Sequence, residues 1–111
     1  QMTLAAATIT ATPTSATYSA QVGETSASQS FAITGSNLTT DITVTAPAYY
    51  QVSTDNSTWS ASAGSVTFTQ TAGSVSGTLY VRYVPTAGEA SVAKNVKLAS
   101  TGATTVNIAV T

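Results

Sequence analysis

The strongest constraint on the fold is an alternation of apolar and hydroxyl-bearing residues with a period of two. It recurs in short runs separated by Gly, Pro, Asn, Asp and Ser. Such runs are typical of half-buried β-strands, because successive side chains on a strand point to opposite faces, while the intervening residues favour turns. We predict about eight short strands and no helix, with strands in the ranges 8–12, 30–34, 41–46, 50–52, 65–69, 78–84, 95–99 and 106–110.

Short strands with turn signals every 8 to 12 residues or so are the pattern of an antiparallel β-sandwich. The 111 residues suffice for one such domain. We therefore expect an all-β sandwich of about seven to nine strands that occupies residues 1–111 as a single module. Within it, residues 1–17 hold the first strand and a linker, and residues 18–111 form the body of the module.

Composition favours a folded domain and excludes several functions. Hydrophobic residues make up 42% of the chain, enough to bury a core. Charged residues are only 6%, with a net charge of -1, so the chain lacks the basic surface that nucleic acids or anionic membranes attract. The absence of His and Cys removes Ser-His-Asp and Cys-His catalysis, disulfides and zinc sites with nitrogen or sulfur ligands. We expect no cofactor and no metal.

The sequence contains no segment that indicates where in or outside the cell the protein lies. No run approaches the roughly 20 consecutive apolar residues of a membrane span, and the N-terminus has no basic region followed by an apolar run. The chain starts at Gln1 and ends within an apolar strand pattern at Thr111. We therefore expect it to be a section of a longer protein and not to insert into a membrane.

Motifs along most of the chain resemble one known type of module. They are F-A-I-T-G-S-N-L at 31–38, D-I-T-V-T-A-P at 41–47, V-S-T at 52–54, Y-V-R-Y at 80–83 and S-T-G-A-T-T at 100–105. From Tyr18 to Thr111 their order is similar to that of the Ig-like repeats of large secreted and cell-surface proteins of Bacteroidetes. In those repeats a Gly and an aromatic residue usually precede V-S-T, whereas this chain has Ala48, Tyr49 and Tyr50.

The resemblance implies an Ig-like sandwich that is extracellular or on the cell surface and is joined in tandem to other domains of its polypeptide. It implies a spacing or adhesive role, without catalytic residues. The partners it implies are neighbouring domains of the same polypeptide and a polysaccharide or another surface protein. The isolated domain is expected to be monomeric.

The charged residues offer few catalytic combinations. A glycosidase needs two carboxylates at roughly 5 to 9.5 Å, and a calcium site needs several oxygen ligands. The four acids, Glu24, Asp41, Asp55 and Glu89, are far apart in sequence and are expected to cap turns. Lys94 and Lys97 fall on outward positions, which disfavours a Ser-Lys dyad.

Aromatic side chains give the alternative function, a carbohydrate-binding module. Sugars stack on exposed aromatic rings with polar groups nearby. Tyr49 and Tyr80 alternate outward and Trp59 follows a turn, so these three with Arg82 are the candidate ligand-binding residues. A lone Trp in a sandwich is more often part of the core, which leaves the position of Trp59 open. Arg82 is expected either to pair with an acid or to lie over an aromatic ring.

The other aromatic residues that fall on inward strand positions are expected in the core: Phe31, Phe68, Tyr50 and Tyr83.

Together with the resemblance, the sequence predicts a non-catalytic Ig-like module with a structural or adhesive role, and a carbohydrate-binding module as the alternative.

Overall fold

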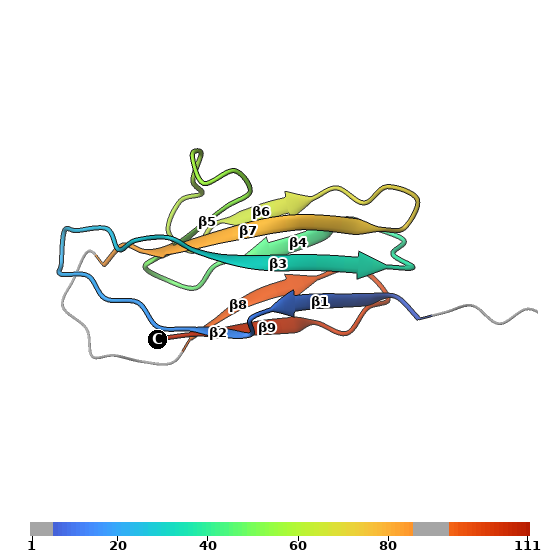
Figure 1. The fold of residues 1–111 in the computed structure, drawn as a ribbon, viewed down its shortest axis with the longest axis horizontal. Helices are drawn as coiled ribbons and strands as arrows, with labels where there is room; N and C mark the ends of the chain where they lie inside the picture. Colours follow the sequence, from blue (N-terminus) through green and yellow to red (C-terminus); the bar gives the residue numbers. More distant parts are fainter. Residues whose placement is uncertain (1–5, 86–93) are drawn as a thin grey trace, which may run out of the picture.

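The computed structural model describes residues 6–85 and 94–111. Within these ranges the chain forms nine strands and no helix, in two sheets (Figure 1). The strands are β1 (Thr8–Thr12), β2 (Ser15–Ala16), β3 (Gln29–Ser36), β4 (Ile42–Thr45), β5 (Tyr50–Ser53), β6 (Ser65–Phe68), β7 (Val75–Tyr83), β8 (Lys94–Ala99) and β9 (Val106–Val110). No helix of the described residues is long and apolar enough to cross a membrane.

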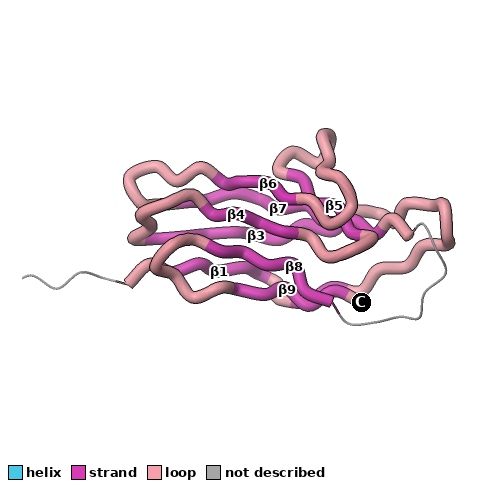
Figure 2. Tube along the Cα trace, turned by 180° about the vertical axis from the view of Figure 1, so that it is seen from behind, coloured by secondary structure: helices cyan, strands magenta, loops and turns pink. Residues whose placement is uncertain are grey.

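One sheet has four strands in the order β1-β3-β7-β5, and the other has five in the order β2-β9-β8-β4-β6. All neighbouring strands are antiparallel except β2 and β9, which are parallel. The two sheets form two layers that lie against each other along the long axis of the molecule (Figure 2). An all-β sandwich is therefore confirmed.

The core lies between the two layers, because every long strand alternates buried and exposed residues. Aliphatic side chains dominate it, and the largest apolar ones with under 2% exposure are Phe31, Ile33, Ile42, Leu79, Leu98 and Ile108. Threonine and serine occupy most outward positions, where a branched side chain suits the pleated surface and its hydroxyl contacts water. This pattern lets a chain with few charges keep a polar surface.

The predicted strands and inward aromatic residues are largely confirmed. Phe31, Phe68 and Tyr50 are buried, and Tyr83 is half-buried and packs against the core. The strand predicted at 78–84 begins earlier, at Val75. The two-residue strand β2 was not predicted.

The first strand belongs to the sandwich. β1 pairs with β3 from Thr8 opposite Ser36 to Thr12 opposite Ala32. Its inward residues Ile9 and Ala11 are part of the core.

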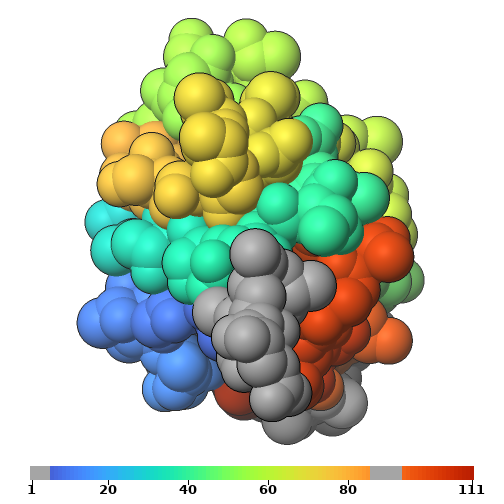
Figure 3. Space-filling view, turned by 90° about the vertical axis from the view of Figure 1, so that its right-hand side faces the viewer, coloured from blue at the N-terminus to red at the C-terminus, as the bar shows by residue number. Residues whose placement is uncertain are grey.

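At the end where β1 begins, loops from both sheets pack together. Leu38, in the β3–β4 loop, is buried, and its backbone N–H donates to the carbonyl of Gly73 in the β6–β7 connection at 2.9 Å. The Thr40 and Ser100 hydroxyls hydrogen-bond at 2.9 Å, which joins the β3–β4 loop to the β8–β9 loop. Figure 3 shows these segments side by side in teal-green, yellow and orange-red.

Candidate functional site

The outer face of the four-stranded sheet brings together two of the predicted binding residues. Gln51 on β5 lies opposite Arg82 on β7, next to the buried pair Val52 and Val81. Because side chains alternate along a strand, Gln51 and Arg82 point away from the core. The Arg82 Nε–H donates to Gln51 Oε1 at 2.8 Å, and the Arg82 guanidinium carbon lies 4.2 Å from the ring centroid of Trp59.

The loop that carries Trp59 is organised by its own side chains. Ser53, at the end of β5, is fully buried, and its Oγ accepts from the backbone N–H groups of Asp55 and Asn56 at 3.1 and 3.0 Å. The same hydroxyl donates to Asp55 Oδ1, which also accepts from the N–H groups of Ser57 and Thr58. Asn56 has a φ of 59°. The predicted turn at 55–57 is confirmed, with Asp55 as its hydrogen-bonding centre.

These hydrogen bonds favour the ionised form of Asp55. The backbone N–H of Thr58 lowers the pKa of this carboxyl most, followed by the N–H of Ser57 and the hydroxyl of Ser53. The Asp55 carboxylate therefore accepts its hydrogen bonds from groups of its own loop.

After Trp59 the chain turns back along β5. The N–H of Ser60 donates to the carbonyl of Val52 at 2.9 Å, and the Ser60 hydroxyl accepts from the N–H of Val52 at 3.1 Å. On the other side, the Ser28 hydroxyl donates to Asn56 Oδ1 at 2.8 Å, just before β3. The loop thus spans β7 and is attached on both sides, which fixes Trp59 beside Arg82.

We name Gln51, Trp59, Tyr80 and Arg82 the outer-face cluster. Tyr80 precedes Arg82 by two positions on β7 and shares its face. All four residues are half-buried. Trp59 is not among the residues of the hydrophobic core, so the alternative that placed the single Trp in the core is wrong. Of the two roles expected for Arg82, the structure shows the contact with an aromatic ring.

Tyr49, the fourth predicted binding residue, lies elsewhere. It precedes β5, with its N–H bonded to the Ser62 hydroxyl at 2.8 Å and the Lys94 Nζ 4.9 Å from its ring centroid. Lys94 is half-buried at the start of β8 and also donates to the carbonyl of Ala48 at 3.3 Å. It shares its face of β8 with the buried Val96 and Leu98, so its predicted outward position is wrong, whereas Lys97 is exposed. Within the described residues, no hydrogen bond or ring contact joins Tyr49 to the outer-face cluster.

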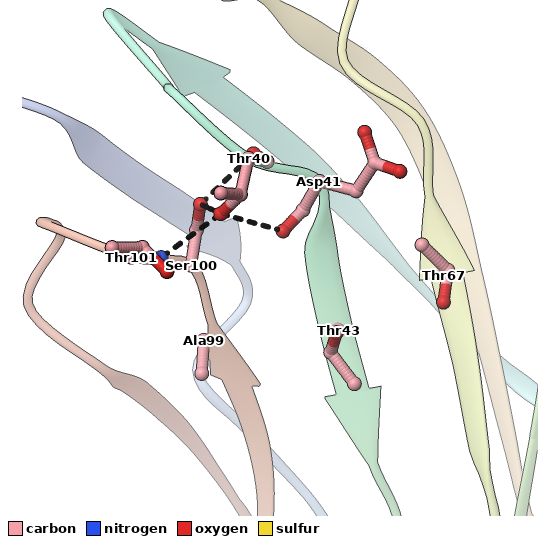
Figure 4. A pocket seen from close by; sticks show the side chains of 7 residues that line it. All are labelled: Thr40, Asp41, Thr43, Thr67, Ala99, Ser100 and Thr101. Atoms are coloured by element: carbon pink, nitrogen blue, oxygen red, sulfur yellow. Dashed lines mark hydrogen bonds between the residues drawn. The ribbon is translucent and has the colours of Figure 1, made fainter.

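A second feature is a shallow hollow of about 520 Å³ on the outer face of the five-stranded sheet (Figure 4). Its lining residues are Thr40, Asp41, Thr43, Thr67, Ala99, Ser100 and Thr101. The Ser100 hydroxyl donates to the carbonyl of Thr40, and the Thr40 hydroxyl accepts from the N–H of Thr101. Asp41 Oδ1 accepts from the N–H of Gln70 at 3.0 Å. The hollow therefore holds one carboxylate and several hydroxyls, of which those of Thr40 and Ser100 bond to each other.

The described acids do not form a cluster. Asp41 and Asp55 each bond to a backbone N–H, at the start of β4 and in the β5–β6 loop, and Glu24 is exposed between β2 and β3. No group of three His, Cys, Asp or Glu residues that could hold a metal ion occurs in the part of the chain that the structure describes. Glu89 lies outside the described residues.

Comparison of the chain with known protein families, with characterised proteins and with solved structures finds no match.

Proposed function

We propose that the chain is an Ig-like module of a larger secreted or cell-surface bacterial protein, with a structural or adhesive role and no catalytic activity. In this role the module spaces or presents the neighbouring domains of its polypeptide. The observation that carries the proposal is the order of the strands, together with the course of the chain along the long axis.

The strand order supports an Ig-like fold. The order β1-β3-β7-β5 corresponds to strands A-B-E-D of an immunoglobulin sandwich, and β9-β8-β4 corresponds to G-F-C. β6 lies beside β4, in the position of C′, although it follows β5 in the chain. In variable-type domains C′ precedes D along the chain. Here the strand in the D position, β5, precedes the strand in the C′ position, β6, and this is the difference from that fold.

The course of the chain suits a spacer. β1 begins at one end of the long axis, whereas Thr111 follows β9 at the other end (Figure 1). Between them the chain advances along β1 and then along β2, which runs parallel to β9. Segments attached at the two ends would be held apart by a packed sandwich.

Spin labels at the two ends test this role. The chain has no Cys, so Thr8→Cys and Thr111→Cys create two unique labelling sites. We expect one narrow distance distribution centred above about 20 Å, because strand residues advance about 3.3 Å each. A broad or bimodal distribution would show that the distance between the two ends is not fixed, and would contradict a spacing role.

The second candidate function is a carbohydrate-binding module. The observation that favours it is the outer-face cluster, in which an indole ring, a guanidinium and an amide are in contact and a phenol lies on the same outer face. Such a combination of flat apolar rings and polar groups suits a sugar ligand.

A further inference from the structure

We propose that the outer-face cluster binds an acidic polysaccharide, with the Arg82 guanidinium receiving the carboxylate of a uronic acid residue. This inference rests on the adhesive and carbohydrate-binding roles proposed above and gives them a ligand class.

The first observation is that Arg82 has no anionic partner among the residues that the structure describes. Its Nε–H donates to Gln51 Oε1, and its guanidinium carbon lies over the Trp59 ring. Within residues 6–85 and 94–111 no carboxylate pairs with it, and its two terminal nitrogens have no protein acceptor. The N–H groups of these two nitrogens lie in one plane and match the two oxygens of a carboxylate.

The second observation is that Arg82 is held in place. Gln51 fixes the guanidinium from the neighbouring strand, and Trp59 fixes it from a loop that is attached to both β5 and Ser28. A side chain that is already ordered loses less conformational entropy when it binds a ligand. Asp55, the acid of this loop, directs its Oδ1 to the loop's own N–H groups.

The third observation is the surface that continues from the cluster. Along β3 and β7 the outward residues near Tyr80 are exposed and uncharged, with Ala32 opposite Thr78 and Thr34 opposite Ser76. A linear sugar chain could lie along this hydroxyl-lined face while one ring packs on the cluster. Since these positions carry no charge, Arg82 alone would select an acidic sugar.

The test uses the single Trp as the reporter. Polygalacturonate is titrated into the protein while Trp59 emission is followed, and its fully methyl-esterified form and poly-glutamate are titrated in parallel. The ester keeps the sugar backbone without the charge, and poly-glutamate keeps the charge without sugar rings. We expect a saturable change with polygalacturonate and an affinity at least about tenfold weaker for the other two polymers.

Variants assign the effect to Arg82. Arg82→Gln removes the charge, and Arg82→Lys keeps it but loses the planar fork. The matched control Lys97→Gln removes one exposed cation from the opposite sheet. We expect Arg82→Gln to weaken binding by about tenfold or more and Arg82→Lys to weaken it less, whereas Lys97→Gln changes it by less than about twofold because a distant exposed charge is screened.

Thermal unfolding of each variant ensures that binding is compared between folded proteins, and Arg82→Lys tests the site even if Arg82→Gln unfolds. Equal binding of the esterified polymer would overturn the acidic class while leaving a neutral carbohydrate-binding module standing. Equal binding of poly-glutamate, or equal losses in Arg82→Gln and Lys97→Gln, would show unspecific charge attraction. Absence of binding to every polymer would overturn the site, and the spin-label distances would still decide the spacing role independently.

Discussion

Tyr49 has a left-handed backbone, with φ at 69°, and the Lys94 Nζ lies 4.9 Å from the centroid of its ring. The contact connects the segment between β4 and β5 to the start of β8 in the five-stranded sheet. Two opposing contributions meet at this residue. A residue with a Cβ is disfavoured in this conformation by about 1–2 kcal/mol, while an ammonium group over a partly exposed ring contributes about 0.5–1 kcal/mol.

Replacing Tyr49 by Gly and by Ala separates the two contributions. Both variants lose the ring, but only Ala keeps the Cβ that disfavours a positive φ. We expect Tyr49→Gly to be more stable than Tyr49→Ala by about 1 kcal/mol in urea unfolding. At the exposed β3 position Ala32, which serves as control, Gly should instead lower the stability. A Tyr49→Gly variant no more stable than Tyr49→Ala would contradict the left-handed conformation.

Asp55 should make the stability depend on pH in the acidic range. Its pKa is lowered in the folded protein, chiefly by the N–H of Thr58, so the native state binds fewer protons than the unfolded state. The stability from this carboxylate is therefore present above the unfolded pKa and is lost as the pH falls through the folded pKa.

Urea unfolding between neutral pH and the acidic range tests this expectation. The slope of stability against pH should decrease in Asp55→Asn, whereas Ser57→Ala, which keeps the backbone N–H, should retain it. An unchanged slope in Asp55→Asn would show that Asp55 does not carry the effect. An NMR titration of the Asp55 carboxyl should give a pKa below its ordinary range.

Gly77 on β7 closely approaches the opposite sheet. A Cβ at this position would lie 2.9 Å from a ring carbon of Phe68, which is buried on β6. Overpacking of this kind destabilises by about 1–3 kcal/mol. We expect Gly77→Ala to lose stability in that range and Phe68→Leu to recover part of it in the double variant. Purely additive effects in the double-mutant cycle would contradict direct contact between the two positions.

The strands and the core could be predicted because each long strand carries its own alternation. Ile33, Val44 and Leu98 are buried as the period of two requires. β2 could not be predicted, since two residues show no period, and Ser15 and Ala16 are a strand only because β9 lies beside them.

The candidate site was predictable in part. The sequence predicts that Arg82 points outward and lies near an acid or an aromatic ring, but Trp59 follows a turn and has no periodic position. Its place depends on the hydrogen bonds of Ser53 and Asp55, which fold the loop. Lys94 was predicted to point outward, but it lies on the same face of β8 as the buried Val96 and Leu98, and it bonds to the carbonyl of Ala48.

Tyr18 provides the last prediction, because its hydroxyl is buried and no described residue hydrogen-bonds to it. The residue is 8% exposed, and its ring centroid lies 5.5 Å from that of Tyr50 in an edge-on arrangement. Burial raises the pKa of this hydroxyl, and Tyr50 adds to the rise. A buried polar group without a partner costs about 1–3 kcal/mol.

Tyr18→Phe removes the hydroxyl and keeps the ring contact with Tyr50. We expect it to unfold at higher urea concentration, with a gain of about 1 kcal/mol, whereas the control Tyr80→Phe on the outer face should change stability by less than about 0.5 kcal/mol. Above a pH of about 10 the unfolded chain releases the Tyr18 proton while the folded chain retains it, so the wild type loses stability as the pH rises. Tyr18→Phe should lose less over the same range. A clear loss of stability in Tyr18→Phe at neutral pH would show that the hydroxyl has a partner in the folded protein.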